Sequence, residues 1–187
     1  MVGIITFHCQ YNYGSALQAL AMQESIRGFH KSCMLLDYYY EKDMKSYDIR
    51  WHSKRPDVIA FDLLTLRKSN KRKKAYHDFH KKFFLLSERT SNWKELQRIS
   101  NTCDILLCGS DQIWNIGLTQ GIHPAYFLQF ADTTYQKLIA YAPSVSLEKI
   151  PEIYEVPLRE TLRRFSYISV REEQTAEQLQ QITITYN

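Results

Sequence analysis

The sequence predicts an α/β fold with a Rossmann-like, doubly wound and mainly parallel sheet that carries helices on both faces. Short apolar runs rich in β-branched residues alternate with longer helical patterns, which is typical of βαβ units. Polar clusters follow several of these runs, as they do where open α/β sheets bind ligands. The chain has 187 residues, 44% of them hydrophobic and 24% charged, which is enough for the core of one soluble domain.

A βαβ unit is predicted at the start of the chain. Residues 2–7 form a buried, β-branched strand, and residues 15–27 form an apolar helix with Ser15 as the candidate N-cap. Gly28 fits the position just past the helix end, and residues 32–38 form the second strand. A right-handed crossover makes the two strands parallel.

The middle of the chain is predicted to hold a loop and two helices. Residues 41–55 are polar and aperiodic, which indicates a long loop. Pro56 begins a helix that extends to about residue 84, with a break expected near residues 69–70. A short helix over residues 93–100 leads into the central strand.

The central strand is the apolar run 104–108, which Gly109 is expected to end. Residues 125–130 are interpreted as a segment that crosses the sheet edge, and residues 137–142 as the next strand. The remaining predicted elements are a helix over 157–165, a strand over 166–170 and a helix to about 181.

Several classes of protein are excluded. The N-terminus lacks the charged region and cleavage site of a signal peptide, and no apolar run approaches the ~20 residues needed to cross a bilayer. The four cysteines have no metal-site spacing and are interpreted as buried thiols of a cytoplasmic protein, so no metal site is expected. The first βα turn has one glycine where a dinucleotide fingerprint needs three, so neither NAD nor a ribose contact at Asp37 is predicted.

Three polar clusters follow predicted strands: residues 8–14, residues 109–115, and Arg171 with Glu172. Because the carboxyl ends of parallel strands meet at one edge of the sheet, these clusters are expected to share a crevice. The candidate ligand contacts within them are Asn12, Tyr13, Gly14, Ser110, Gln112, Trp114, Asn115 and Arg171.

Two residues are candidates for proton transfer. Asp111 could act as a general base, because a carboxylate accepts a hydroxyl proton when burial raises its pKa. The alternative interpretation is an N-cap or turn aspartate that holds the loop. His8 is the weaker candidate, since a lone histidine after a strand is more often a structural residue.

The binding candidates also have two interpretations. Arg171 could bind a phosphate or carboxylate through two hydrogen bonds, or it could pair with a neighbouring glutamate. Trp114 and Tyr13 could stack on a sugar ring, or they could cover the end of the sheet.

The main basic cluster, Arg67 to Lys74, lies in the long predicted helix. One interpretation is a solvated helix face. The other is attraction to an anionic partner, either an acidic polymer or a membrane surface, and the latter would place the protein peripherally on a membrane. No groove-reading or base-stacking module accompanies the cluster, so nucleic acid is not expected as a partner.

Several segments, in order, resemble the polysaccharide pyruvyl transferase family. They are residues 3–7, 12–19, 109–115, 127–131, 139–144 and 169–172. The resemblance implies two Rossmann-like domains arranged as in GT-B glycosyltransferases. Residues 1–187 would be the N-terminal domain, with the C-terminal domain absent from this chain.

The resemblance also implies a reaction. Members of the family transfer the enolpyruvyl portion of phosphoenolpyruvate to sugar hydroxyls, which gives a pyruvate ketal in exopolysaccharide biosynthesis. Phosphoenolpyruvate is the donor substrate, no cofactor is implied, and the partner is a sugar or polysaccharide-precursor acceptor. The half seen here would bind the acceptor and shape the cleft, while cations of the other half would hold the donor.

Two alternatives stay open from the sequence. One is a glycosyltransferase of GT-B-like architecture that uses a nucleotide sugar. The other is a non-catalytic module whose basic helix docks on an anionic surface.

Overall fold

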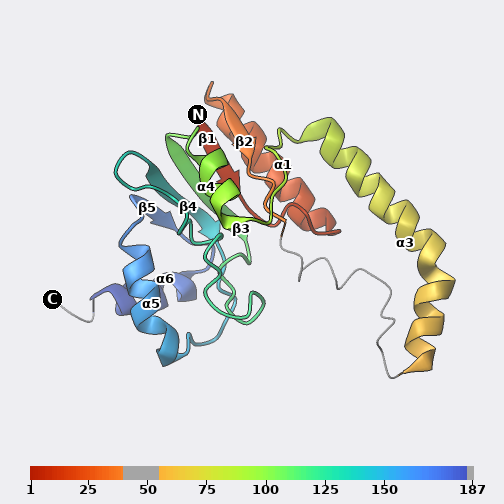
Figure 1. The fold of residues 1–187 in the computed structure, drawn as a ribbon. Coiled ribbons are helices and arrows are strands. Elements are labelled where there is room, and N and C mark those ends of the chain that lie inside the picture. The colour runs from red at the N-terminus through yellow and green to blue at the C-terminus, as the bar shows by residue number, and fades with distance from the viewer. Residues whose placement is uncertain (40–54, 185–187) are drawn as a thin grey trace.

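The computed structural model describes residues 1–39 and 55–184 and shows a five-stranded, all-parallel sheet in the order β2-β1-β3-β4-β5 (Figure 1). The strands are β1 (Val2–Ile5), β2 (Cys33–Leu35), β3 (Ile105–Asp111), β4 (Lys137–Pro143) and β5 (Tyr167–Ser169). The helices are α1 (Tyr13–Gly28), α3 (Pro56–Phe83), α4 (Trp93–Ser100), α5 (Glu155–Leu162) and α6 (Glu173–Ile184), with a short 3₁₀ helix over Glu152–Tyr154.

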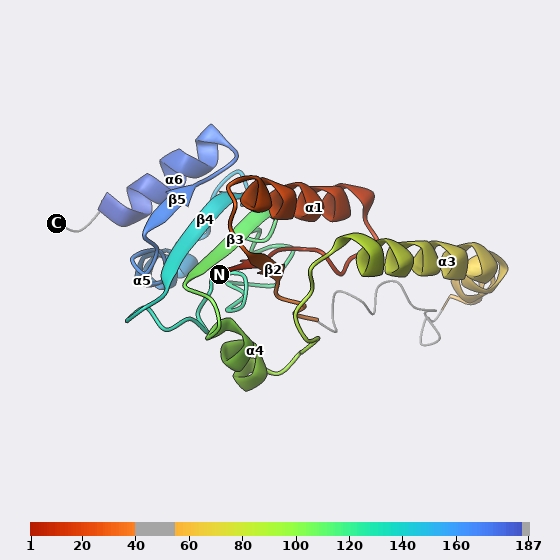
Figure 2. The same cartoon turned by 90° about the horizontal axis from the view of Figure 1, so that it is seen from above.

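Helices cover both faces of this sheet, which confirms the predicted Rossmann-like, doubly wound fold. Figure 2 shows α1 and α6 on one side, with α4 and α5 on the other. Successive strand residues therefore enter opposite cores. Ile4 and Leu107 pack in the core beneath α1, whereas Ile5 and Leu106 pack in the larger core on the opposite face.

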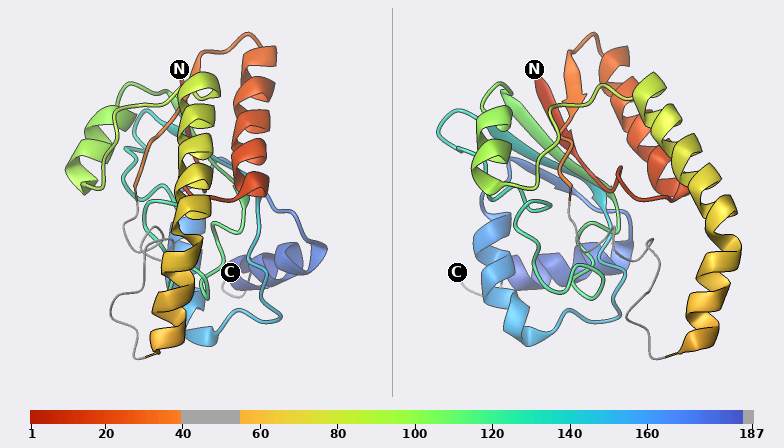
Figure 3. Two further views of the ribbon diagram at one scale, coloured as in Figure 1. Left: turned by 90° about the vertical axis from the view of Figure 1, so that its right-hand side faces the viewer. Right: turned by 45° about the vertical axis from the view of Figure 1, so that its right-hand side comes forward.

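The long helix α3 differs from its prediction. It is continuous from Pro56 to Phe83, so the break expected near residues 69–70 is wrong. Of its described side chains only those of Tyr76 and His80 are buried. Its C-terminal half lies beside α1, while its N-terminal half projects away from the sheet (Figures 1 and 3). No helix in the described parts of the chain is long and apolar enough to cross a membrane.

The central strand β3 also runs further than predicted. Gly109 does not end it, because the strand continues to Asp111 and pairs with β4 along its length. Gly109 has φ of +122°, and a Cβ atom there would collide with the carbonyl group of Tyr141 in β4. Glycine therefore lets the strand bend here while it stays in contact with its neighbour.

Other boundaries shift by a few residues. Strands β1, β2 and β5 are shorter than predicted, while α1 begins two residues earlier and α5 begins before Pro157. Residues 125–130 form buried turns and add no strand to the sheet. Most of the predicted loop 41–55 lies outside the described residues.

Candidate functional site

The two predicted loops that follow β1 and β3 meet at Asp111. The Ser15 hydroxyl group, in the first turn of α1, donates a hydrogen bond of 2.6 Å to Asp111 Oδ2, and the Gln112 backbone N–H donates one of 2.8 Å to Asp111 Oδ1. The Thr6 hydroxyl group also donates to the carbonyl oxygen of Ser110 at 3.2 Å. Through the hydrogen bond from Ser15 the Asp111 carboxylate connects β3 to α1. Because Asp111 is only half-buried, it is also accessible from the surface.

Asn12 begins α1, which corrects the assignment of Ser15 as the N-cap. The Asn12 Oδ1 atom accepts hydrogen bonds from the backbone N–H groups of Gly14 (2.8 Å) and Ser15 (3.4 Å). The asparagine side chain thus satisfies two amide groups that lack partners within the helix. Tyr13 is 69% exposed, and its ring centroid lies 5.0 Å from that of Tyr76 in α3.

The indole of Trp114 packs in the core. It is 1% exposed, stacks on Phe127 with ring centroids 4.8 Å apart, and donates a hydrogen bond of 3.1 Å to the Tyr126 carbonyl oxygen. In this structure it therefore presents no face on which a sugar could stack. Nearby, the Asn115 amide donates to Gln112 Oε1 at 3.1 Å, so these two candidates brace one another at the surface.

The third cluster, after β5, is linked to the other two through β4. Arg171 Nε donates a hydrogen bond of 2.8 Å to Glu172 Oε1, which also accepts one of 2.7 Å from the Ser144 hydroxyl group. The Ser144 backbone N–H in turn donates to the Asp111 carbonyl oxygen at 2.8 Å. Parallel strand ends thus bring the three predicted clusters to one edge, with Arg171 paired to its neighbouring glutamate.

A second polar network lies beyond the ends of β1 and β2. His8 is 1% exposed, and its Nε2 atom lies 3.1 Å from Asp37 Oδ1 while Nδ1 lies 3.1 Å from the Thr6 carbonyl oxygen. Cys9 Sγ is 3.2 Å from His8 Nε2 and 3.4 Å from Asp37 Oδ1. Arg89 Nε donates to Asp37 Oδ2 at 3.0 Å, so each carboxylate oxygen of Asp37 faces a basic group.

His8 and Asp37 form a charged pair although both side chains are buried. Burial alone would lower the pKa of His8, but the electrostatic and hydrogen-bond interactions with Cys9 and Asp37 outweigh it and raise that pKa. Burial would likewise raise the pKa of Asp37, but the hydrogen bond and charge of His8 and the contact with Arg89 lower it to about 2. The pair is therefore an imidazolium and a carboxylate at neutral pH, and His8 is fixed within it.

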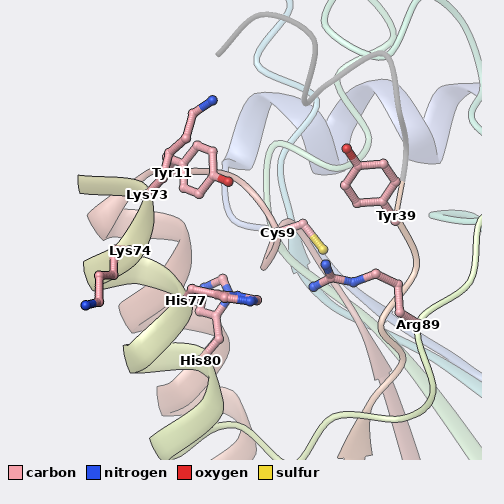
Figure 4. A pocket seen from close by; sticks show the side chains of 8 residues that line it. All are labelled: Cys9, Tyr11, Tyr39, Lys73, Lys74, His77, His80 and Arg89. Carbon is pink, nitrogen blue, oxygen red and sulfur yellow. The ribbon is translucent and has the colours of Figure 1, made fainter. Parts of the chain in front are cut away.

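Beside this network lies a pocket of about 460 Å³ (Figure 4). The size is within the range of small-ligand sites. It lies between α3 and the two segments that follow β1 and β2. Most of its lining side chains are basic or aromatic. The lining residues are Cys9, Tyr11, Tyr39, Lys73, Lys74, His77, His80 and Arg89.

A metal ion has one candidate site in the described residues. His8, Cys9 and Asp37 offer ligand atoms that all lie within 4.8 Å of one another. Asp37 is already paired with Arg89, and the adjacent pocket carries Lys73 and Lys74. Neighbouring positive charge opposes binding of a divalent cation, so the local charge favours a protonated His8 over a metal ion.

Sequence reasoning missed the pocket. The sequence shows the basic cluster and allows an anionic partner for it, but it does not place Lys73 and Lys74 beside a pocket. Arg89 gave no signal, because it lies in an irregular segment that aligns beside β2 through isolated bridges at Leu86 and Thr90. Cys9 and Tyr11 belong to the predicted cluster 8–14, and Asp37 follows β2, so these positions could have indicated a site.

Comparison with known proteins completes the description. The family model for polysaccharide pyruvyl transferase matches residues 12–187. Searches of curated proteins and of solved structures found no match. Because the family model covers nearly the whole chain, the protein belongs to the polysaccharide pyruvyl transferase family.

Proposed function

We propose that this protein takes part in transfer of pyruvate, as a ketal, from phosphoenolpyruvate to a sugar in polysaccharide biosynthesis. The match of residues 12–187 to the family model carries this proposal. The polar edge formed by the ends of β1, β3 and β4 supports it, because open parallel sheets bind ligands there. This chain would supply one wall of the cleft, and a second Rossmann-like domain would supply the other.

The chemistry requires a proton acceptor beside a sugar hydroxyl group. One hydroxyl oxygen bonds to C2 of the enolpyruvyl group as C3 gains a proton, and a second replaces phosphate at the same carbon, its proton leaving with the phosphate or a base. In this proposal Asp111 accepts the hydroxyl proton. Its contact with Ser15 holds the carboxylate in place. Asn12, Tyr13 and Gly14 directly precede Ser15, and Ser110, Gln112 and Asn115 lie close to Asp111 in sequence.

The decisive experiment measures pyruvylation directly. The chain, joined to the second Rossmann-like domain that the proposal requires, is incubated with phosphoenolpyruvate and candidate acceptor sugars, and phosphate release and the ketal methyl signal in NMR spectra are followed. We expect Asp111→Asn to lower the rate by about 100-fold or more, the usual size of a general-base contribution. Asp132→Asn is the matched control, since Asp132 precedes β4 at the opposite edge of the sheet. A normal rate for Asp111→Asn would show that Asp111 is not the base.

A nucleotide-sugar glycosyltransferase is the competing assignment. Calorimetric titration with phosphoenolpyruvate and with a panel of nucleotide sugars separates the two. Binding of nucleotide sugars alone would favour the glycosyltransferase and remove support for pyruvyl transfer.

Helix α3 supports a further proposal, that the protein lies peripherally on an anionic membrane. Phe61, Leu64, Lys68 and Arg72 recur at helical spacing on one face of α3, and all four are exposed. Interfacial helices combine exposed apolar side chains, which enter the headgroup boundary, with basic side chains, which are attracted to anionic lipids. The substitutions Leu64→Ser, Lys68→Glu and Arg72→Glu should together abolish sedimentation with vesicles rich in phosphatidylserine. Equal sedimentation of this variant and the unchanged protein would contradict membrane docking.

A further inference from the structure

We infer that the pocket beside the His8–Asp37 pair binds the phosphate group of a phosphorylated ligand. None of the residues proposed above to contact the acceptor lies in its lining. The claim of phosphate binding stands without the proposed reaction. The choice between phosphoenolpyruvate and a phosphorylated acceptor as the ligand rests on that reaction.

The charge of the lining selects an anion. The residues that the structure describes around the pocket include Lys73, Lys74 and Arg89 and no carboxylate. The nearest buried acid, Asp37, has its oxygens occupied by His8 and by Arg89 Nε. Positive charge concentrated in a concave, partly desolvated space attracts small anions strongly.

Arg89 is positioned for such a ligand. Its Nε atom is held by Asp37, which leaves the terminal nitrogens of the guanidinium group without an ion-pair partner in the described chain. Figure 4 shows the guanidinium group directed into the pocket beside Cys9. An arginine fixed at one end presents its remaining N–H groups in the fork that suits phosphate oxygens.

His80 gives a second and independent indication that the pocket binds a ligand. It is 6% exposed and lines the pocket, and its Nε2 atom has no hydrogen-bond partner among the described residues. Its ring extends from α3 toward the same space as the Arg89 guanidinium group (Figure 4). A buried N–H group without a partner destabilises the fold, so a ligand oxygen that accepts a hydrogen bond from His80 Nε2 would remove that cost.

The electrostatics of His80 fit a neutral donor. Burial, followed by the positive charge of His8, lowers the pKa of His80 to about 4, so its imidazole is neutral at pH 7. Neutral His80 can donate one N–H bond while Arg89 and the lysines supply the charge. A phosphate group, with several oxygens that accept hydrogen bonds from different directions, matches donors placed on opposite sides of the pocket.

Cys9 provides a direct test of occupancy. It lines the pocket and is half-buried, whereas Cys33, Cys103 and Cys108 are buried. The full chain is treated with N-ethylmaleimide, and labelling of Cys9 is followed by mass spectrometry with and without inorganic phosphate, phosphoenolpyruvate and glucose 1-phosphate. All three should slow labelling of Cys9, while pyruvate and glucose should not. Unchanged labelling with every phosphate compound would overturn the proposal.

Matched variants separate a built site from general positive charge. Lys73→Gln with Lys74→Gln removes two charges from the lining, whereas Lys71→Gln with Lys81→Gln removes two from the same helix outside it. We expect the first pair to weaken phosphate binding, measured by calorimetry, about tenfold or more and the second pair to change it little. Equal losses in the two pairs would show diffuse attraction and contradict a site.

His80→Phe tests the buried donor without emptying its place. His80 stacks on Phe84 with ring centroids 4.8 Å apart, a contact that phenylalanine can keep. Since the loss of a hydrogen bond to a charged group costs ~1.5–3 kcal/mol, phosphate affinity should fall at least about tenfold. Thermal stability should hold or rise, because a buried nitrogen without a partner is removed. Wild-type affinity in a folded His80→Phe variant would exclude His80 from the site.

The ligand comparison also separates this proposal from the proposed reaction. Tighter binding of phosphoenolpyruvate than of glucose 1-phosphate would identify the donor, and the reverse order would identify a phosphorylated acceptor. Phosphate binding without any pyruvylation would leave the pocket in place and contradict only the reaction.

Discussion

Within strand β3, Asp111 acts through its polar side chain, whereas Gly109 is needed because it has no side chain. Asp111 holds its loop with hydrogen bonds to both carboxylate oxygens, and it adopts a left-handed backbone with φ of 73°. Aspartate tolerates that region better than most residues. Gly109 has φ of +122° and lies against the backbone of β4, where any Cβ atom would strike the Tyr141 carbonyl group. The bend that presents Asp111 therefore depends on a residue that makes no polar side-chain contact.

This leads to a prediction for Gly109→Ala. Alanine would be strained at this positive φ, and its Cβ atom would collide with the Tyr141 carbonyl group between the paired strands β3 and β4. We therefore expect a loss of about 2 kcal/mol or more in the free energy of unfolding. Urea denaturation followed by circular dichroism measures it. Gly28→Ala is the matched control, because nothing lies within 4 Å of its added Cβ atom and Gly28 belongs to a helix. That variant should be neutral or more stable by up to about 1 kcal/mol, and a similar loss in both variants would contradict the explanation.

Other individual residues could be predicted only in part. Asp111 was identified with two roles left open, and the structure gives it the contacts of the loop-holding role while leaving the catalytic role to experiment. Trp114 was chosen for its position among polar residues, yet its indole turns into the core to meet Phe127. A loop sequence places a residue near a strand end, but the direction of its side chain depends on distant packing partners that the local pattern does not contain.

Among the elements, α1 depends on its first cap. Asn12 accepts hydrogen bonds from the backbone N–H groups of Gly14 and Ser15. Ser15, which the sequence pattern predicts as the cap, uses its hydroxyl group on Asp111 instead, so that prediction is wrong. Both residues were polar and suitably spaced, so the choice between them was decided by a contact across 96 positions of sequence.

Asn12→Ala should therefore lower the free energy of unfolding by about 1 kcal/mol, the usual cost of losing such a cap. Asn12→Asp keeps an accepting oxygen at the same place and should retain most of the stability. Denaturation curves of the two variants give the comparison. If Asn12→Ala and Asn12→Asp unfold alike, the cap is not a significant source of stability, and Asn12 is better explained by ligand contact alone.

The longest element was the hardest to place from sequence. The pattern of α3 predicted its start at Pro56 and nearly its end, but a break was expected in its polar middle. The helix stays continuous because that stretch contains good helix formers such as lysine and arginine and no proline or glycine. The periodicity of the sequence could not show that only the C-terminal half of α3 would lie beside α1.

At the scale of the whole molecule, the parallel sheet was predictable because each strand is short, apolar and followed by a helix or a polar turn. The convergence of the three predicted clusters followed from that topology. The pocket could not be predicted from the sheet topology, because its lining combines residues after β1 and β2 with residues of α3 and with Arg89. These pieces lie far apart in sequence, and none carries a recognisable motif.

The buried groups at this meeting place predict how the stability of the whole fold depends on pH. In the folded protein the interactions with Cys9 and Asp37 raise the pKa of His8 to about 10 against the effect of burial. The unfolded state has an ordinary histidine pKa near 6.5. The folded state therefore binds the His8 proton more tightly, and this stabilisation is complete below about pH 6.5 and is lost as pH rises toward 10.

His80 has the opposite effect on the acid side. Burial, with the charges of His8, Arg89 and His77, lowers its pKa to about 4 despite the opposing charge of Asp37. The unfolded state then binds the proton more tightly, so stability falls as pH drops from about 6.5 to about 4. The Asp37 carboxylate, with a pKa of about 2, adds a further loss below about pH 4. Together these groups predict a maximum of stability near pH 6 to 7.

Urea midpoints measured from pH 4 to pH 10 test this profile, each group contributing a slope of at most about 1.4 kcal/mol per pH unit. His80→Phe should flatten the acid side between pH 4 and 6.5 and leave the alkaline side unchanged. His8→Gln should flatten the alkaline side, whatever its effect on stability at pH 7. His30→Gln is the control, because His30 is exposed and lies outside the buried network. An acid side that keeps its full slope in His80→Phe would show that the buried imidazole beside the pocket does not control the acid response.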